Sequence, residues 1–406
     1  MGSDWVGSRS LLAFSFAGQG AQTPGMGRGW QGEDGWELVE QASAVSGRDV
    51  ARLLTSAGAD ELRLTRNAQL AILTMGLVMD AALRRVGLPP AVCVGHSVGE
   101  YAALISAGAL TFEDGIRLVV ERAEAMQAAD EENPGTMSAL VGLDDDDAQG
   151  ACGRADGDVW VANYNAPGRT VVAGAVGAVR AAEGAAVELG AARVVPLEVG
   201  GAYHTRFMAP ARPRLRDALA RTPFHTLQVP VVANVDARSH WSAPEWPALL
   251  SAQLCSPVRW SQSIRRLVSM DVDTIVQLGP SVALGRLVKR SAPGVRVLTV
   301  REPADIDVVL ALALGGLEEL DALGELSERL HMTERLVVSP TTGVYRATPA
   351  SGVFTTGGEI LAEGDVVGMV GDEPVASPFA GWLMGLLASE GQRVRKGQPI
   401  AWLRLL

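Results

Sequence analysis

A serine flanked by glycines lies in the segment "AVCVGHSVGEYAAL", residues 91–104. The apolar run before the glycines predicts a short buried strand, and "EYAALI" after them predicts a helix. A strand, a sharp glycine turn and a helix are what a nucleophilic serine needs, because glycines let the backbone bend without a Cβ clash. Ser97 is therefore a candidate nucleophile, although the G-x-S-x-G pattern alone is equally compatible with a bend that has no chemical role.

A serine nucleophile needs a base, and the chain offers five histidines. His96 adjoins Ser97, but on so tight a turn we expect its ring to point away from the direction of attack. Three others stand in polar or proline-rich segments, where surface or loop positions are expected: His225, His240 and His331. His204, in "GGAYHTRFMAP", follows an expected strand where the chain returns to its first pattern. It is the candidate base, with a structural histidine beside a glycine turn as the alternative.

The composition describes a folded protein of more than one domain. At 406 residues and 48% hydrophobic content, the chain is long enough for two or three units with sizeable cores. A formal net charge of -11 argues against nucleic acid as a partner. No apolar run is long enough to cross a bilayer, and the N-terminal segment lacks the pattern of a secretory signal, so we expect no membrane association. The cysteines show no metal-ligand spacing and are expected to be reduced thiols of a cytoplasmic protein: Cys93, Cys152 and Cys255.

Two stretches of the chain alternate strand-like and helix-like segments, which is typical of an α/β fold. In residues 1–133, the strand "LLAFSF" enters the loop "AGQGAQ", and "AQLAILTMGLVMDAALRRVG" (68–87) has helical periodicity up to Gly87. The pattern resumes in residues 200–320 with the expected strands "PVVANV" and "DTIVQLG". We therefore expect one α/β core assembled from these two stretches.

Residues 134–199 interrupt this core with a different order of elements. "TMSALVGL" predicts a strand, "DDDDAQGACGRA" a helix, and "VWVANYNA" and "RTVVAG" two strands joined by Pro167-Gly168. "AVGAVRAAEGAAVELG" then predicts a second helix and "ARVVPLEV" a last strand. This order, β-α-β-β-α-β, is the ferredoxin-like arrangement, so we expect an inserted ferredoxin-like subdomain.

Residues 336–406 contain an internal repeat. "VVSPTTGV" recurs as "VASPFAGW", and "GGEILAEGDVVGMV" recurs as "EGQRVRKGQPIAWL". Short strands separated by glycine turns predict a small all-β module made of two similar halves. The preceding residues, 317–335, are expected to form a terminal helix and a linker, with the linker at 321–335.

Six segments occur in this order: "FAGQGAQ", "GHSVGEYAA", "ERAEAMQ", "NYNAPGRTVVAG", "GAYHTRFM" and "SPVRW". Together they resemble the malonyl-CoA:acyl carrier protein transacylase family, and most of all the discrete acyltransferases that serve fatty acid and polyketide synthases. The resemblance implies an α/β-hydrolase-like core with a ferredoxin-like insertion, which the strand pattern suggests independently.

The resemblance implies roles for four residues at the centre of the site. Ser97 matches the family's nucleophile and His204 its catalytic base. The backbone N–H groups of Gln19 and Val98 match the family's oxyanion hole. The family's histidine is held by a main-chain carbonyl instead of an acidic residue, and we expect that carbonyl near residues 258–260.

Further roles concern the acyl group. Arg122 matches the arginine that pairs with the free carboxylate of malonyl, whereas the residues alone would allow 121–124 to be a solvated helix face. Asn165 resembles an asparagine that lines the family's pocket, and Gln253 lies near the segment whose backbone orients the histidine.

Two positions bear on specificity. Family members that take malonyl usually have a small aliphatic residue after the nucleophile and an aromatic residue before the histidine, which Val98 and Tyr203 match, although phenylalanine is usual at the second position. Ala17 replaces the family's common proline, and Arg169 stands where glutamine is usual. We interpret these departures as tuning of the activity.

The implied reaction transfers malonyl from malonyl-CoA to the phosphopantetheine thiol of an acyl carrier protein through a malonyl-serine, with no metal or redox cofactor. Because an acidic enzyme would meet two acidic ligands, we expect an arginine patch at the pocket mouth, with Arg206 as a candidate. The alternatives are a hydrolase that clears acyl chains from carrier proteins and a malonyl-loading subunit of a malonate decarboxylase.

The C-terminal repeat resembles biotinyl/lipoyl carrier domains, which carry a prosthetic group on a lysine between their two halves. Here that join reads "GMVGDEPVASP" and contains no lysine, while Lys396 lies in a turn of the second half. A swinging arm is therefore not expected. Docking of a partner, such as a carrier protein, and a stabilising appendage remain as alternatives.

Overall fold

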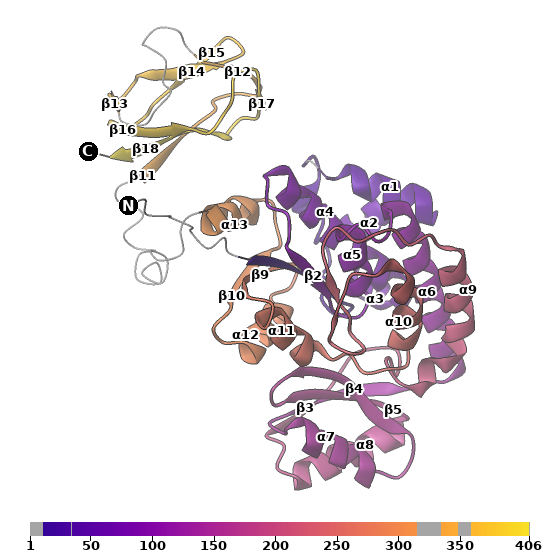
Figure 1. The fold of residues 1–406 in the computed structure, drawn as a ribbon. Coiled ribbons are helices and arrows are strands. Elements are labelled where there is room, and N and C mark those ends of the chain that lie inside the picture. Colours follow the sequence, from indigo (N-terminus) through magenta and orange to yellow (C-terminus); the bar gives the residue numbers. More distant parts are fainter. Residues whose placement is uncertain (1–10, 34, 315–333, 348–358, 406) are drawn as a thin grey trace, which may run out of the picture. The chain divides into compact units, whose positions relative to one another are not determined.

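The computed structural model describes residues 11–33, 35–314, 334–347 and 359–405 (Figure 1). The chain divides into two compact units, Met1–Leu314 and Gly315–Leu406. The helix expected within 317–335 falls outside the described residues, except that Glu334 and Arg335 begin a strand. In the described part, no helix has both the length and the apolar character needed to cross a membrane.

A six-stranded sheet forms the centre of the first unit, in the order β10-β9-β1-β2-β7-β8. Neighbouring strands are parallel except for the antiparallel pair β7 and β8. The strands are β1 (Leu11–Phe16), β2 (Val92–Gly95), β7 (Val231–Val232), β8 (Ser239–His240), β9 (Val272–Leu278) and β10 (Arg296–Val300). The strand expected at 230–235 is thus only two residues long.

Helices cover both faces of this sheet, because its strands are apolar on both sides. On β1, Phe14 and Phe16 belong to one buried cluster and Ala13 to the other, as the alternation of side chains along a strand requires. The first cluster includes residues of α4 (Thr65–Arg85) and α5 (Gly99–Ser106), and the second includes residues of α11 (Trp260–Val268) and α12 (Ala283–Ser291).

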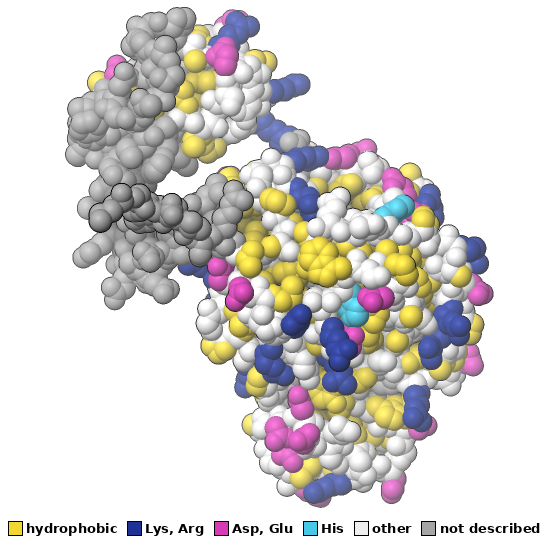
Figure 2. Space-filling model, in the orientation of Figure 1, with side chains coloured by type: hydrophobic (Ala, Val, Ile, Leu, Met, Phe, Trp, Pro, Cys, Tyr) yellow, Lys and Arg dark blue, Asp and Glu magenta, His cyan; other side chains and the backbone are white. Residues whose placement is uncertain are grey.

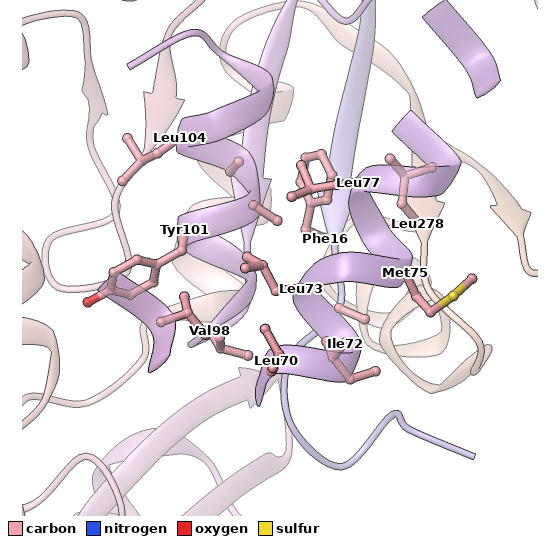
Figure 3. Close-up of a cluster of buried hydrophobic side chains, with 14 of the residues drawn as sticks. Phe16, Leu70, Ile72, Leu73, Met75, Leu77, Val98, Tyr101, Leu104 and Leu278 are labelled. Atoms are coloured by element: carbon pink, nitrogen blue, oxygen red, sulfur yellow. The ribbon is translucent and has the colours of Figure 1, made fainter. Parts of the chain in front are cut away.

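The packing of α4 against α5 holds the serine turn in place. Figure 3 shows side chains of the two helices meeting beside Phe16: Leu70, Leu73 and Leu77 from α4, and Val98, Tyr101 and Leu104 at or within α5. Leu70, Leu73 and Tyr101 are fully buried, and burial of an apolar side chain of this size contributes roughly 1.5–3 kcal/mol. Helix α4 begins at Thr65 instead of residue 68 and ends before Gly87, whose φ of 83° stops the helix.

The remaining helices of the first unit are η1 (Arg28–Trp30), α1 (Glu37–Ser46), α2 (Val50–Thr55), α3 (Ala59–Arg63), α6 (Phe112–Glu132), η2 (Arg206–Ala211), α9 (Arg212–Arg221), η3 (Ala243–Glu245), α10 (Trp246–Gln253) and α13 (Ala304–Leu314).

A second, antiparallel sheet is inserted between α6 and the return of the chain to the core, with strand order β4-β5-β3-β6. Its elements are β3 (Thr136–Val141), α7 (Asp145–Arg154), β4 (Val159–Ala166), β5 (Arg169–Gly174), α8 (Val176–Glu188) and β6 (Arg193–Pro196). The sheet is tied to the core because the N–H of Tyr164 donates to the carbonyl of Val258, and the N–H of Val258 donates to that of Ala162.

The second unit contains two four-stranded sheets in the described residues, ordered β11-β18-β16-β13 and β15-β14-β12-β17. Its strands are β11 (Glu334–Val338), β12 (Gly343–Arg346), β13 (Glu359–Leu361), β14 (Val366–Val370), β15 (Glu373–Ala376), β16 (Gly381–Leu386), β17 (Arg393–Val394) and β18 (Pro399–Leu405).

The sequence repeat relates these two sheets strand by strand. In the repeat, β11 corresponds to β15, β12 to β16, β13 to β17 and β14 to β18. Replacing each strand by its counterpart converts the order of one sheet into the order of the other. The two Ser-Pro turns also match, since Ser339 Oγ donates to the carbonyl of Thr341 at 2.6 Å and Ser377 Oγ to that of Phe379 at 2.7 Å.

Candidate active site

Ser97 lies on a strained turn between β2 and α5. Its φ is 54°, a left-handed value that non-glycine residues seldom adopt. Gly95 makes the turn possible, because a Cβ there would lie 1.9 Å from the carbonyl oxygen of Gly99. A Cβ on Gly99 would likewise lie 2.4 Å from the carbonyl oxygen of Phe16. Both glycines of the pattern are therefore required by close backbone approach.

The loop after β1 lies against this turn. A Cβ on Gly18 would come within 2.4 Å of the carbonyl oxygen of His96, so the loop and the turn touch through their backbones. Gln19 follows in this loop, and its side chain contacts Thr65 and Gln69 of α4 at 3.4 Å each. In the described structure no hydrogen bond uses the backbone N–H of Gln19 or of Val98. Both of these donors are therefore unused within the described structure.

His204 contacts Ser97 directly. Its Nε2 lies 2.8 Å from Ser97 Oγ, and its Nδ1 lies 2.9 Å from the main-chain carbonyl of Gln253. Since a carbonyl can only accept, Nδ1 carries the proton and Nε2 is free to accept from the serine.

The expectation of a carbonyl near residues 258–260 is wrong. The carbonyl of Val258 accepts the N–H of Tyr164 in the inserted sheet. Gln253 instead ends α10, where the last carbonyls of a helix have no partner within the helix.

The environment of His204 keeps its ring neutral. The residue is 4% exposed, and burial, reinforced by the positive charge of Arg122, lowers the pKa of His204 to about 3, because both effects disfavour the charged ring. The hydrogen bond to the Gln253 carbonyl opposes this shift only in part. A neutral imidazole is the form that accepts a proton from a serine hydroxyl.

Arg122 lies inside the site. The solvated-face interpretation of 121–124 is wrong for Arg122, which is fully buried, whereas Glu121 and Glu124 are half-buried and pair with Arg214 and Arg48. Burial lowers its pKa from the ordinary value, although a guanidinium remains a cation.

The partners of Arg122 in the described structure are neutral groups. Its Nη1 donates to Gln69 Oε1 at 2.6 Å, and its Nη2 donates to Gln253 Oε1 at 2.9 Å and to Ser97 Oγ at 3.2 Å. Nε is buried without a partner. A buried cation held by amides beside a serine hydroxyl is suited to receive an anionic ligand.

The structure places Tyr203 near these groups and Asn165 against His96. Tyr203 is 6% exposed, and its hydroxyl lies 2.6 Å from Thr65 Oγ1, the group that also contacts Gln19. Asn165 Oδ1 lies 3.0 Å from His96 Nε2, so Asn165 contacts His96 and is not brought to Ser97 by any hydrogen bond of the described residues. As expected, His96 points elsewhere, with its ring edge against Trp260.

Sequence reasoning missed three polar residues that hold the site. Gln69 lies on the buried face of α4, Glu100 follows the glycine turn, and Asn234 follows β7; all three are at most 1% exposed. A polar residue inside an apolar helical run, as in "NAQLAIL", is a signal that could have identified Gln69. No comparable local signal marks the partners of Glu100 and Asn234. Within the described ranges, no group of three His, Cys, Asp or Glu side chains could hold a metal ion.

A serine on a strand-turn-helix elbow, a neutral histidine and two unused backbone donors are the kinds of group that acyl transfer through a serine ester requires. Residues 13–297 match the acyl transferase domain family, so the chain belongs to this family. The malonyl CoA-acyl carrier protein transacylase of Bacillus subtilis (strain 168) is 34% identical over 74% of this chain and 96% of its own length. That of Escherichia coli (strain K12) is 36% identical over 74% of this chain and 99% of its own.

Solved structures give the same result for the fold. An acyl carrier protein S-malonyltransferase from Vibrio cholerae has a TM-score of 0.71 and 34% identity, covering 74% of this chain and all of that chain. A malonyl-transacylase in complex with its type II PKS acyl-carrier protein has a TM-score of 0.72 and 34% identity, with 74% and 99% coverage.

Proposed function

We propose that this protein is an acyl carrier protein S-malonyltransferase of fatty acid or polyketide biosynthesis, acting in the cytoplasm. It would move malonyl from coenzyme A to the phosphopantetheine thiol of a carrier protein through a malonyl ester of Ser97. The observation that carries the proposal is the fully buried Arg122, which donates to Ser97 Oγ at 3.2 Å and otherwise to amides. A malonyl carboxylate would supply the charge that this cation lacks.

In the first half-reaction, Ser97 Oγ attacks the thioester carbonyl of malonyl-CoA while its proton moves to Nε2 of His204. The contact of 2.8 Å between these atoms supports a direct transfer. The carbonyl π electrons move to the oxygen, forming a tetrahedral intermediate. When this collapses, the C–S bond breaks, and CoA leaves with the proton from His204.

The tetrahedral oxyanion needs donors that are not already in use. The N–H groups of Gln19 and Val98 are the proposed pair, with added stabilisation from the N-terminal end of α5. Loss of one such donor typically costs about 2.7–4 kcal/mol of transition-state stabilisation. The second half-reaction repeats these steps with the carrier thiol as nucleophile, His204 taking its proton, and Ser97 as leaving group.

Arg122 distinguishes this function from a carrier-protein hydrolase, which would need no carboxylate clamp. Val98 and Tyr203 are proposed to shape the acyl pocket for malonyl. Asn165, which contacts His96 beside the nucleophile, is proposed to line the acyl pocket.

The test is incubation with a panel of acyl-CoAs, followed by the intact mass of the protein and peptide mapping. A malonyl adduct on Ser97 that is discharged by a holo carrier protein is expected. An adduct discharged only by water, or a preference for acyl groups without a carboxylate, would contradict the proposal.

The rate of acylation should be nearly independent of pH on the acid side. Between about pH 7.5 and about pH 5.5, kcat/KM for malonyl-CoA should change little, because His204 with a pKa of about 3 stays unprotonated throughout. A histidine of ordinary pKa would lose about 90% of its neutral form at about pH 5.5. A one-proton decline of kcat/KM centred near the ordinary value, in a protein still folded by circular dichroism, would contradict this prediction.

Carrier protein recognition is proposed to use two exposed arginines, Arg206 and Arg259, which lie against strand β4 of the inserted sheet. Arg206 lies over the ring of Trp160, with 5.7 Å between guanidinium carbon and ring centroid. Arg259 lies over the ring of Tyr164 in the same way, at 6.0 Å, and both contacts are of the cation–π kind. Both aromatic residues belong to β4, which is tied to the core beside α11. Figure 2 shows basic side chains, with acidic ones among them, on the visible face of the first unit.

Replacing both arginines with alanine should raise the KM for the carrier protein roughly threefold to tenfold and reduce its dependence on salt. The exposed Arg154 on α7 provides the matched control, and Arg154→Ala should leave both properties unchanged. If the KM of the wild-type protein for the carrier protein does not rise with salt, these arginines do not bind the carrier protein by their charge.

The second unit is proposed to be a biotinyl/lipoyl-like barrel, residues 336–406, joined by a linker at 321–335 to the acyltransferase core of 1–133 and 200–320. The exchange of its two sheets under the sequence repeat supports this assignment. The turn between β14 and β15, where a carrier lysine would stand, reads Gly371-Asp372.

We also propose that residues 134–199 form a ferredoxin-like insertion, which their β-α-β-β-α-β order supports.

A further inference from the structure

Glu100 is a buried carboxyl group behind the nucleophile. It is the second residue of α5 and is 1% exposed. Its two oxygens accept from different segments of the core: Oε1 accepts the backbone N–H of Asn234 at 2.6 Å, and Oε2 accepts from the side-chain Nε2 of Gln253. Neither segment is a neighbour of α5 in sequence, so one carboxyl group joins the loop after β7 and the end of α10 to the serine turn.

The Gln253 branch leads to the reacting groups. The Nε2 that donates to Glu100 also donates to the carbonyl of Ser97 at 3.0 Å. The amide oxygen of the same side chain then accepts from Arg122 Nη2 at 2.9 Å, and the main-chain carbonyl accepts from His204 Nδ1. Gln253 therefore contacts the nucleophile's backbone, the base and the buried cation.

The Asn234 branch leads to the backbone of the strained turn. Asn234 Oδ1 accepts the N–H of Ser97 at 2.8 Å, and its Nδ2 donates to the carbonyl of Gly95 at 2.7 Å. These two bonds hold the residues on which the left-handed φ of Ser97 depends. They also occupy the N–H of Ser97, which leaves that of Val98 as the free donor of the turn.

We propose that Glu100 is a positioning residue for acyl transfer. By accepting from Gln253 and Asn234 together, it fixes which way the Gln253 amide faces and so directs Arg122 onto Ser97, and it anchors the residue whose main-chain carbonyl accepts from His204. This inference rests on the proposed malonyl transfer for the role of Arg122, but not for the alignment of Ser97 with His204.

The chemical reason lies in the direction of the hydrogen bonds. Each oxygen of a carboxyl group has a lone pair for an incoming N–H, whether or not the group is ionised. Burial raises the pKa of Glu100 to about 8, so the group can hold a proton and still accept from both partners. An amide at this position has only one accepting atom, because its nitrogen is a donor.

Glu100→Gln separates this role from packing, because it preserves size and removes one acceptor. The backbone N–H of Asn234 cannot turn away, so the new amide oxygen should face it and the new NH₂ should face the NH₂ of Gln253. To avoid two opposed donors, the Gln253 amide must turn over, which presents NH₂ to Arg122. We expect kcat/KM for malonyl-CoA to fall about 10-fold to 100-fold, and the malonyl-to-acetyl preference to fall with it.

Glu100→Asp is the complementary variant, because it keeps two accepting oxygens and shortens the side chain. It should retain more of the malonyl preference than Glu100→Gln, even if its unfolding temperature is lower. The exposed Glu40 on α1 provides the matched control, and Glu40→Gln should leave preference and rate unchanged. A role in packing alone predicts the reverse order, with the size-preserving variant closer to wild type.

A second readout does not involve malonyl. Labelling of Ser97 by phenylmethanesulfonyl fluoride depends on the serine and the base, and it should slow about threefold to tenfold in Glu100→Gln. The inference would be overturned if Glu100→Gln lowered kcat/KM equally for malonyl-CoA and acetyl-CoA. It would also be overturned if Glu100→Asp lost more of the malonyl-to-acetyl preference than Glu100→Gln. Wild-type protein that is labelled at Ser97 but takes no malonyl would contradict the proposed function, while slower labelling of Glu100→Gln would still support the positioning role.

Discussion

Replacing Ser97 with alanine is expected to abolish the acyl-enzyme and to lower malonyl transfer by a factor of about 10⁴ or more, as removal of a serine nucleophile does in other serine enzymes. The reason is that, among the described residues, no other hydroxyl shares the contacts of Ser97 Oγ with His204 at 2.8 Å and Arg122 at 3.2 Å. The measurement is the mass of the protein after incubation with malonyl-CoA, together with the rate of carrier-protein malonylation.

The exposed Ser56 supplies the control, and Ser56→Ala should behave as wild type. Ser97→Ala should remain folded, because alanine can keep the backbone bonds to the side chains of Asn234 and Gln253. A malonyl adduct of undiminished yield in Ser97→Ala would show that the nucleophile lies elsewhere and would end the proposed mechanism.

Replacing Arg122 with alanine is expected to weaken malonyl transfer by about 3–5 kcal/mol, the cost of breaking a buried ion pair. The malonyl carboxylate would then be buried without its cation. The rate of acetyl transfer should fall much less, because an acetyl group has no carboxylate to pair with the arginine. The positive charge of Arg122 also lowers the pKa of His204, so its removal makes the base stronger. The ratio of kcat/KM for malonyl-CoA to that for acetyl-CoA is the decisive measurement.

Arg117 lies on the same helix, α6, and pairs with Asp114 at the surface, which makes Arg117→Ala the matched control. Because Arg122→Ala leaves the amide oxygens of Gln69 and Gln253 without their donor, thermal unfolding must be followed in parallel. An unchanged malonyl preference in a folded Arg122→Ala protein would exclude the carboxylate clamp and favour the hydrolase alternative.

The serine turn could be predicted because its causes are local. Gly95 and Gly99 lie within two residues of Ser97, and the close backbone approaches that require them arise within the turn and from β1. The expected strand and helix on either side follow from the periodicity of apolar residues. The position of His204 could also be proposed from sequence, although its contact with Ser97 spans 107 residues.

Other features could not be predicted because their partners lie far away in the chain. Three of the four residues 121–124 are charged, and only the packing of α6 decides that Arg122 is buried while Glu121 and Glu124 are half-buried and form ion pairs. The carbonyl that holds His204 belongs to Gln253 at the end of α10 and not to residues 258–260, where the carbonyl of Val258 accepts from Tyr164 of the inserted sheet.

The sequence by itself determined the α/β pattern, the elbow at Ser97 and the repeat of the second unit, since each depends on residue spacing within one segment. The tertiary structure alone decided which polar groups meet around the serine. Glu100 accepts hydrogen bonds from Gln253, which is 153 residues away in the sequence, and from Asn234, which is 134 residues away. Hydrogen bonds of this kind depend on the distance and direction between atoms of separately packed elements, and no periodicity along the chain encodes that geometry.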